Sequence, residues 1–209
     1  LGDVYKRQAY MRDNGVPEWC IESCLKIKYL FPKAHAVAYC LMSYRIAYYK
    51  VYYPAAFYAT FFNTKLSDFV YSIIINGLES IQVALKSYGQ RYDLTAREEG
   101  IRRVLEVAEE MYARDIKLEK ADLYKSHASK FILSEREGYL LPPLSSVDNV
   151  SEAMAIDIVR EREKGEFISV EDLNKRTSVN KNALESLKNF GMVDGLGEEN
   201  QMSLFDGMF

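Results

Sequence analysis

The stretch that most constrains this chain is residues 30–54, LFPKAHAVAYCLMSYRIAYYKVYYP. A Phe31-Pro32 turn opens it, and Pro54 ends it because proline lacks the N–H that a helix interior needs. No Asp or Glu occurs in residues 23–64. The cations of that segment are Lys26, Lys28, Lys33, Arg45 and Lys50. The pattern predicts one aromatic-rich helix with a locally positive surface, for which phosphates are the natural counter-charge in a chain of formal net charge -3.

One face of this predicted helix carries side chains at alternating steps of four and three residues. They are His35, Tyr39, Met42, Ile46 and Tyr49. Lys33 and Arg45 stand at the two ends of a neighbouring stripe. Two interpretations remain open: a core helix whose cations extend to the solvent, or an anion site that Lys33 and His35 form at the start of the helix.

Length and composition limit the class of protein. The 209 residues allow one or two domains with a core of ordinary size. No apolar run of about 18 residues occurs, and no secretory signal is visible. Three cysteines cannot form a complete disulfide framework. We therefore expect a location in the reducing cytoplasm and no membrane partner.

Cysteines gather on a helix that Pro17 opens after a turn at Asn14-Gly15. Its expected apolar side is Trp19, Cys20, Ile21, Cys24 and Leu25. A metal site would draw its ligands from Cys20, Cys24, His35 and Cys40. Structural zinc sites usually use tight CxxC turns, and the sequence has none. Buried thiols acting as small apolar side chains are the favoured interpretation, so we predict no metal site.

Further helices follow Pro54. We expect an aromatic helix over residues 55–62 and a helix over residues 68–87 that Ser67 caps. Another begins at Thr95, where Thr95 and Glu98 form a capping box. Its predicted buried stripe is Ile101, Val104, Leu105, Ala108 and Met111.

The character of the sequence changes at residues 115–143. Residues 116–118 and 130–133 alternate like short strands. Residues 138–141 lead into Pro142-Pro143, which we interpret as a domain boundary.

Residues 144–196 contain two helical hairpins in succession. The first turn covers 147–150 and leads into a helix from Ser151; Ser169 caps the next helix, which the second turn at 177–180 follows. In the helix that starts at Ser151, we expect four residues to face the core: Ala153, Ala155, Ile156 and Val159. The arrangement is similar to a tandem helix-hairpin-helix module, in which turn amides backed by a helix start bind backbone phosphate without reading bases.

The run FPKAHAVAYCLMSYRIAYYKVYYPAAFYATFF resembles the fingers segment of bacterial C-family replicative polymerases, the alpha subunits of DNA polymerase III, and is most similar to the Gram-positive PolC type. The resemblance extends from about Ala9 to the C-terminus. It implies a mainly α fold with a small β element. The implied parts are a non-native edge at 1–8 (LGDVYKRQ), a fingers segment at 9–141, a tandem helix-hairpin-helix domain at 142–196 and a flexible clamp-binding tail at 197–209.

The resemblance also implies roles for particular residues. The nucleotide-binding residues would be Phe31, Lys33, His35, Tyr39 and Arg45. Contacts to DNA would come from Asn149, Ser178, Asn180 and Lys181. The tail motif Gln201, Met202, Ser203, Leu204 and Phe205 is similar to the pentapeptide with which PolC-type polymerases bind a sliding clamp, with Leu204 and Phe205 as apolar anchors.

The first turn departs from the family pattern of apolar-Pro-Gly-apolar-Gly. This chain has Val147, Asp148, Asn149 and Val150 instead. Asn tolerates a left-handed backbone, so Asn149 can replace a glycine. Asp148 would repel a phosphate, so the second turn is chemically the more suitable of the two.

Catalysis would need carboxylates elsewhere in a longer enzyme. In this family they form an Asp-x-Asp pattern that holds two divalent metals, and no Asp-x-Asp occurs in this sequence. We therefore expect no catalytic residue here, Mg²⁺ in the full-length enzyme, and primer-template DNA, dNTP, sliding clamp and other replisome subunits as partners. The alternatives are a stand-alone helical DNA-binding or adaptor protein and the metal-dependent domain considered above.

Overall fold

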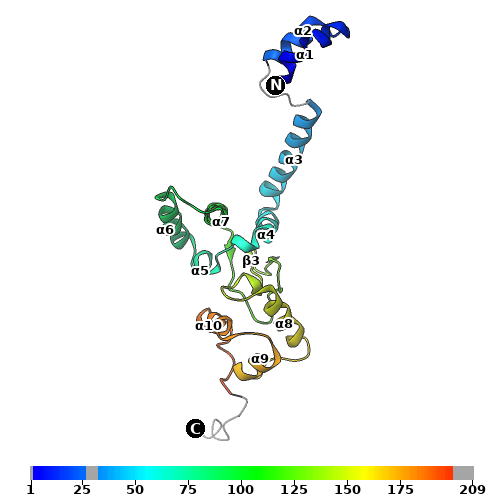
Figure 1. Cartoon of the computed structure of the whole chain (residues 1–209). Coiled ribbons are helices and arrows are strands. Elements are labelled where there is room, and N and C mark those ends of the chain that lie inside the picture. The colour runs from blue at the N-terminus through cyan, green and yellow to red at the C-terminus, as the bar shows by residue number, and fades with distance from the viewer. Residues whose placement is uncertain (1, 27–32, 200–209) are drawn as a thin grey trace, which may run out of the picture. The chain divides into compact units, whose positions relative to one another are not determined.

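The computed structural model describes residues 2–26 and 33–199, and it divides into two compact units, residues 1–48 and 49–209. The described chain is mainly helical with one small three-stranded sheet, as the sequence predicts (Figure 1). None of the described helices is both long enough and apolar enough to cross a lipid bilayer. The domain boundaries expected from the sequence stay predictions.

Two short helices open the first unit. Its elements are α1 (Gly2–Asp13), α2 (Glu18–Lys26) and most of α3 (Lys33–Tyr52). Gly15 takes a φ of 73° in the turn after α1, and Arg12 forms a salt bridge of 2.6 Å with Glu18. Ile21 is fully buried, whereas Trp19 is 70% exposed. The prediction that both lie on the apolar side was wrong, because residues two apart point to opposite sides of a helix.

The long aromatic helix begins and ends close to the predicted positions. α3 ends at Tyr52, and Pro54 starts the next helix. No side chain of α3 is buried by the described part of the chain. Within the described residues, α3 is therefore not a core helix.

Helices, a small sheet and two 3-10 turns make up the second unit. The elements before the sheet are α4 (Pro54–Thr64), η1 (Leu66–Asp68), α5 (Tyr71–Ile74), α6 (Leu78–Gly89) and α7 (Ala96–Ala113). The elements from the sheet onward are β1 (Lys117–Leu118), β2 (Ile132–Leu133), β3 (Tyr139–Leu141), η2 (Leu144–Ser146), α8 (Glu152–Arg162), α9 (Val170–Arg176) and α10 (Lys181–Asn189).

Aromatic rings join α4 to the segment that enters the sheet. The ring of Phe62 lies 5.3 Å from that of Phe69 and 5.4 Å from that of Phe131, centroid to centroid. The Phe69 and Phe131 rings are 4.9 Å apart. Next to them the Asn63 Oδ1 atom accepts a hydrogen bond of 2.7 Å from the Phe131 N–H. This cluster fixes α4 against the strand β2.

The helix predicted over residues 68–87 is interrupted, and that prediction was wrong. Ser67 lies inside η1 and caps no helix. Gly77 takes a φ of 89°, which ends the helical path after α5, and α6 starts directly after it. Tyr71 and Ile74 are fully buried, so the short helix α5 is held by packing. α6 ends at Gly89, two residues beyond the predicted end of the helix.

The capping box of α7 is confirmed. The Thr95 side chain accepts from the Glu98 N–H, and the Glu98 side chain accepts from the Thr95 N–H at 2.9 Å. Four of the five predicted stripe residues are buried: Val104, Leu105, Ala108 and Met111.

The two short strands that the sequence predicts are confirmed as β1 and β2, and β3 adds a third strand to them. β3 lies between the other two; β1 pairs with it in parallel and β2 pairs with it antiparallel. Beyond the sheet, Ser151, Ser169 and Asn180 cap α8, α9 and α10 with their side-chain oxygens.

The inward face of α8 differs from the prediction. Ala155 and Ile158 are fully buried, while Ala153 is exposed and Ile156 is 50% exposed. Ala153 and Ile156 each lie two residues before a buried residue, so they point to the opposite side of the helix. The buried stripe therefore runs through positions three apart from Ala155 onward.

Candidate nucleic-acid interface

The first hairpin turn is compact and held by its own backbone. The Val147 N–H donates to the Leu144 carbonyl at 3.1 Å, and the Val150 N–H donates to the Val147 carbonyl at 3.0 Å. Asn149 has a φ of 66°, which confirms that an asparagine adopts the left-handed backbone here. Its Nδ2 atom donates to the Ser186 Oγ atom on α10 at 2.9 Å. The first turn is thus anchored to the last helix of the second hairpin.

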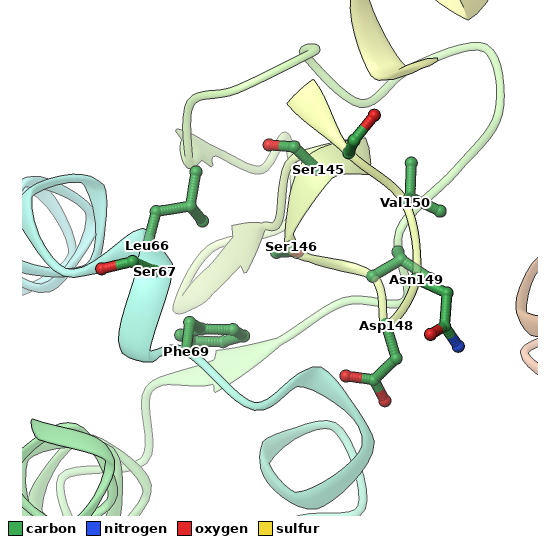
Figure 2. Close-up of a pocket in the computed structure, with 10 residues that line it drawn as sticks. Leu66, Ser67, Phe69, Ser145, Ser146, Asp148, Asn149 and Val150 are labelled. Atoms are coloured by element: carbon green, nitrogen blue, oxygen red, sulfur yellow. The ribbon is translucent and has the colours of Figure 1, made fainter. Parts of the chain in front are cut away.

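A pocket of about 420 Å³ lies beside this turn (Figure 2). Its lining residues are Leu66, Ser67, Phe69, Ser145, Ser146, Val147, Asp148, Asn149, Val150 and Ser151. Within the described chain, the buried Ser145 hydroxyl oxygen has no hydrogen-bond partner. The only charged group of the lining is the Asp148 carboxylate, which disfavours a phosphate.

The start of α8 supplies free donors next to the first turn. The Ser151 Oγ atom accepts the Met154 N–H at 3.3 Å. Among the described residues, the structure records no acceptor for the N–H groups of Glu152 and Ala153. Two unpaired amides at a helix start favour an anion, in opposition to Asp148.

The second hairpin turn is occupied by a carboxylate from the first hairpin. The Ser178 N–H donates to the Asp157 Oδ2 atom at 2.7 Å, and the other carboxylate oxygen accepts from the Arg160 guanidinium. Hydrogen bonds from the Ser178 hydroxyl and N–H hold the pKa of Asp157 below its usual value. Ser178, predicted to contact DNA, is therefore engaged inside the protein.

The two other residues predicted at this turn differ in their surroundings. The Asn180 Oδ1 atom accepts the Ala183 N–H at 2.9 Å and so caps α10. Lys181 is exposed at the first position of α10. No acceptor within the described residues is recorded for the N–H groups of Lys181 and Asn182. The beginning of α10 thus combines two free amides with one cation.

Arg176 ties the connection between α8 and α9 together. Its guanidinium donates to the carbonyl oxygens of Gly165 at 3.0 Å and Glu166 at 3.2 Å, and also to that of Glu161. The same group lies 4.6 Å from the centre of the Phe167 ring. Sequence reasoning missed this residue, because its partners lie up to 15 residues away in the chain.

The predicted nucleotide-binding residues lie on the exposed surface of α3. Lys33, His35, Tyr39 and Arg45 are all exposed, and the His35 and Tyr39 rings meet edge to face with centroids 4.5 Å apart. Tyr39 also lines a hollow of about 230 Å³ with Ala38 and Met42. Phe31 lies outside the described residues. One helix therefore presents the four described residues to the solvent.

The predicted clamp-binding motif also lies outside the described residues. The chain just before it is held against the second hairpin: the Val170 N–H donates to the Gly197 carbonyl at 2.8 Å, and Lys188 forms a salt bridge of 2.8 Å with Glu198. Among the described residues, no group of three or more His, Cys, Asp or Glu side chains could hold a metal ion.

Comparison with known proteins first defines the class of the hairpin region. A family profile described as a helix-hairpin-helix motif matches residues 115–203. The range includes the sheet and both turns described above. The fold and the family match agree that this region is a helix-hairpin-helix module.

Comparison over nearly the whole chain is more specific. The chain is 52% identical over 196 residues to the PolC-type DNA polymerase III of Caldanaerobacter subterraneus subsp. tengcongensis and 47% identical over 201 residues to that of Clostridium perfringens. It is 42% identical over 196 residues to the PolC-type DNA polymerase III of Bacillus subtilis. The chain belongs to the PolC-type DNA polymerase III family. The alignments cover 93%, 95% and 93% of this chain and 14% of the length of each relative.

Proposed function

We propose that the chain acts in DNA replication as a segment of a DNA-directed DNA polymerase, in which it positions duplex DNA and the incoming deoxynucleotide. The homology to proteins named DNA polymerase III supports this proposal over a stand-alone DNA-binding or adaptor protein. The helix-hairpin-helix match supports the duplex-binding part. A replicative polymerase acts where the chromosome lies, so a cytoplasmic location in a bacterium is part of the proposal.

Duplex binding rests on one observation above all: two capped helix starts, α8 and α10, each follow a tight hairpin turn and keep free amides. Such amides bind phosphate oxygens without reading bases. Lys181 adds a cation at the start of α10, where a phosphate would bind. The binding should therefore be independent of sequence and sensitive to salt.

The test is fluorescence anisotropy of the full chain with a short labelled DNA duplex between about 50 and 200 mM salt. Lys181→Gln should weaken binding severalfold and reduce the slope of log affinity against log salt by about 0.9, the value for one lost phosphate contact. The control is Lys86→Gln on α6, which makes the same charge change outside the hairpin module. Equal losses in both variants would contradict a specific phosphate contact at α10, and no binding by the unaltered chain would contradict duplex binding itself.

Nucleotide binding by α3 rests on its exposed, acid-free surface. Lys33 would balance triphosphate charge, with Arg45 as the second candidate for this role, His35 would donate a hydrogen bond, and Tyr39 would pack against the sugar or base. Phe31 would take part in the same packing. In a full-length PolC-type relative that carries this segment, Lys33→Ala should raise the Michaelis constant for deoxynucleotide several-fold. An unchanged constant with normal turnover would contradict this role.

The tail and the metal belong to the same proposal. A peptide of residues 201–205 should bind a sliding clamp with an affinity on the order of micromolar, and its Phe205→Ala version should not. Equal binding by the two peptides would remove the motif from the proposal. Mg²⁺ would be held in the full-length enzyme by carboxylates outside this chain, and other replisome subunits would be further partners.

A further inference from the structure

Asp157 stands where the two hairpins of the module meet. It belongs to α8, the helix that follows the first turn, yet its carboxylate bonds the second turn 21 residues further along the chain. One oxygen accepts the Ser178 N–H at 2.7 Å, and the other accepts from the Arg160 guanidinium. The carboxylate side chain is only 16% exposed. An anion is thus already bound to a turn whose type normally presents its amides to solvent.

The surroundings of that carboxylate are those of an oxyanion site. Ser178 contributes an N–H and a hydroxyl, and both hydrogen bonds favour the ionised form of Asp157. Arg160 remains 60% exposed and also bonds Glu161 Oε1 at 3.3 Å. Lys164 forms a salt bridge of 2.6 Å with the same Glu161 oxygen. A backbone N–H, a hydroxyl and a nearby guanidinium are groups that bind a phosphate oxygen.

We propose that the Asp157 carboxylate occupies the phosphate position of the second turn and competes there with the DNA backbone. The inference rests on the proposed duplex binding. In this arrangement Ser178 cannot offer its N–H to a phosphate while Asp157 holds it. The second turn then contributes through Lys181 and the start of α10, and Asp157 limits the affinity of the module.

Charge and donor supply both support this assignment. A phosphate oxygen within a few ångströms of Ser178 would meet a like charge, which is unfavourable at a partly buried site. It would also have to replace a hydrogen bond that is already formed. Neutralising Asp157 removes the repulsion, and truncating it also frees the N–H of Ser178. Either change should tighten duplex binding.

The experiment compares the full chain with its Asp157→Asn variant on a short labelled DNA duplex over a salt series. We expect Asp157→Asn to bind several-fold more tightly and to steepen the slope of log affinity against log salt by about 0.9, because Arg160, no longer paired with the Asp157 carboxylate, can then neutralise one more phosphate. Asp157→Ala should bind at least as tightly as Asp157→Asn. The control, Glu163→Gln, removes one negative charge at the exposed C-terminal end of α8, which bonds neither turn.

The outcomes separate competition from two other roles. If Asp157→Asn and Glu163→Gln tighten binding equally, only net charge matters and the inference is overturned. If both Asp157 variants bind more weakly, Asp157 serves to brace the second turn and the inference is again overturned. The melting temperature of each variant is also measured, to show whether weaker binding comes from a loss of folded protein. Tighter binding cannot have that cause. If neither the unaltered chain nor any variant binds duplex, the proposed function fails, whereas binding by the unaltered chain with no gain from the Asp157 variants refutes only the competition.

Discussion

Asn149 shows how far the residue scale could be predicted. Its side chain tolerates a left-handed backbone, and the φ of 66° confirms that expectation. Its bond to Ser186 could not be predicted, because it joins residues 37 apart whose approach depends on the packing of two hairpins. The Asp157–Ser178 contact was missed for the same reason. The backbone conformation at one position depends on that residue and its neighbours, whereas these side-chain partners depend on the tertiary structure.

Glu98 makes the pH dependence of stability testable at one residue. Hydrogen bonds from the Thr95 N–H and then the Thr95 hydroxyl, followed by that from Arg91, lower the pKa of Glu98 from 4.5 to about 2. A lowered folded-state pKa adds stability above the unfolded pKa, and that stability is lost as pH falls from about 4.5 towards 2. Glu98→Gln should therefore flatten the fall of melting temperature over this range.

The matched control for Glu98 is Glu79→Gln in the exposed first turn of α6. It should leave the acid limb of the profile unchanged. A Glu98→Gln variant with the same acid limb as the unaltered chain would contradict the role given to this carboxylate.

At the scale of elements, helix starts were easier to predict than helix continuity. The caps at Thr95 and Ser169 are confirmed because a capping side chain acts within its own first turn. The break between α5 and α6 was missed because apolar residues continue across it in the sequence. Gly77 was the available signal, since an Asn-Gly pair marks a turn. The predicted buried side of α8 was partly wrong because alanine occurs on buried and exposed faces alike and is a weak indicator of the buried side.

Two glycines of this region should respond in opposite ways to alanine. Gly77 has a φ of 89° and a ψ of -170°, a backbone that alanine adopts only under strain. Gly77→Ala should lower the free energy of unfolding by about 1–3 kcal/mol. Gly89 lies in α6, and a Cβ there would meet nothing within 4 Å. Gly89→Ala should raise the free energy of unfolding by about 0.4–1 kcal/mol.

Chemical denaturation of the two single variants checks this pair. Both changes add the same methyl group, so the difference in sign isolates the backbone conformation. Equal effects on the unfolding free energy would contradict the positive φ at Gly77.

At the scale of the whole molecule, the sequence predicted a mainly α chain with a small sheet and two hairpins, and these are confirmed. It did not predict which aromatic residues form the core. Both α3 and α4 are rich in aromatic residues and alanine, yet α3 buries no side chain in the described chain while α4 buries Tyr58 and Phe62 completely. Aromatic content alone does not distinguish a face that meets a neighbouring element from one that does not.

Phe62 tests whether the second unit depends on its aromatic cluster. The side chain is fully buried and contacts rings from two other segments. Phe62→Ala should lower the free energy of unfolding by about 3–5 kcal/mol, because it removes apolar contacts and leaves a cavity.

Thermal or urea unfolding measures the loss, with Tyr92→Ala as the control. Tyr92 is fully exposed, and its replacement should change the free energy of unfolding by less than about 0.5 kcal/mol. A Phe62→Ala variant as stable as the control would show that the cluster does not support the second unit.

The exposure of α3 has a consequence for how it would recognise a ligand. A helix that buries none of its side chains within the described residues depends largely on intrinsic propensity, and tyrosine, valine and isoleucine are only moderate helix formers. Binding a small charged ligand would then also have to order this helix, and the conformational entropy lost in doing so would reduce the net binding free energy. A second protein surface laid along the tyrosines would remove that entropic loss beforehand, and the same cations would hold their ligand more tightly.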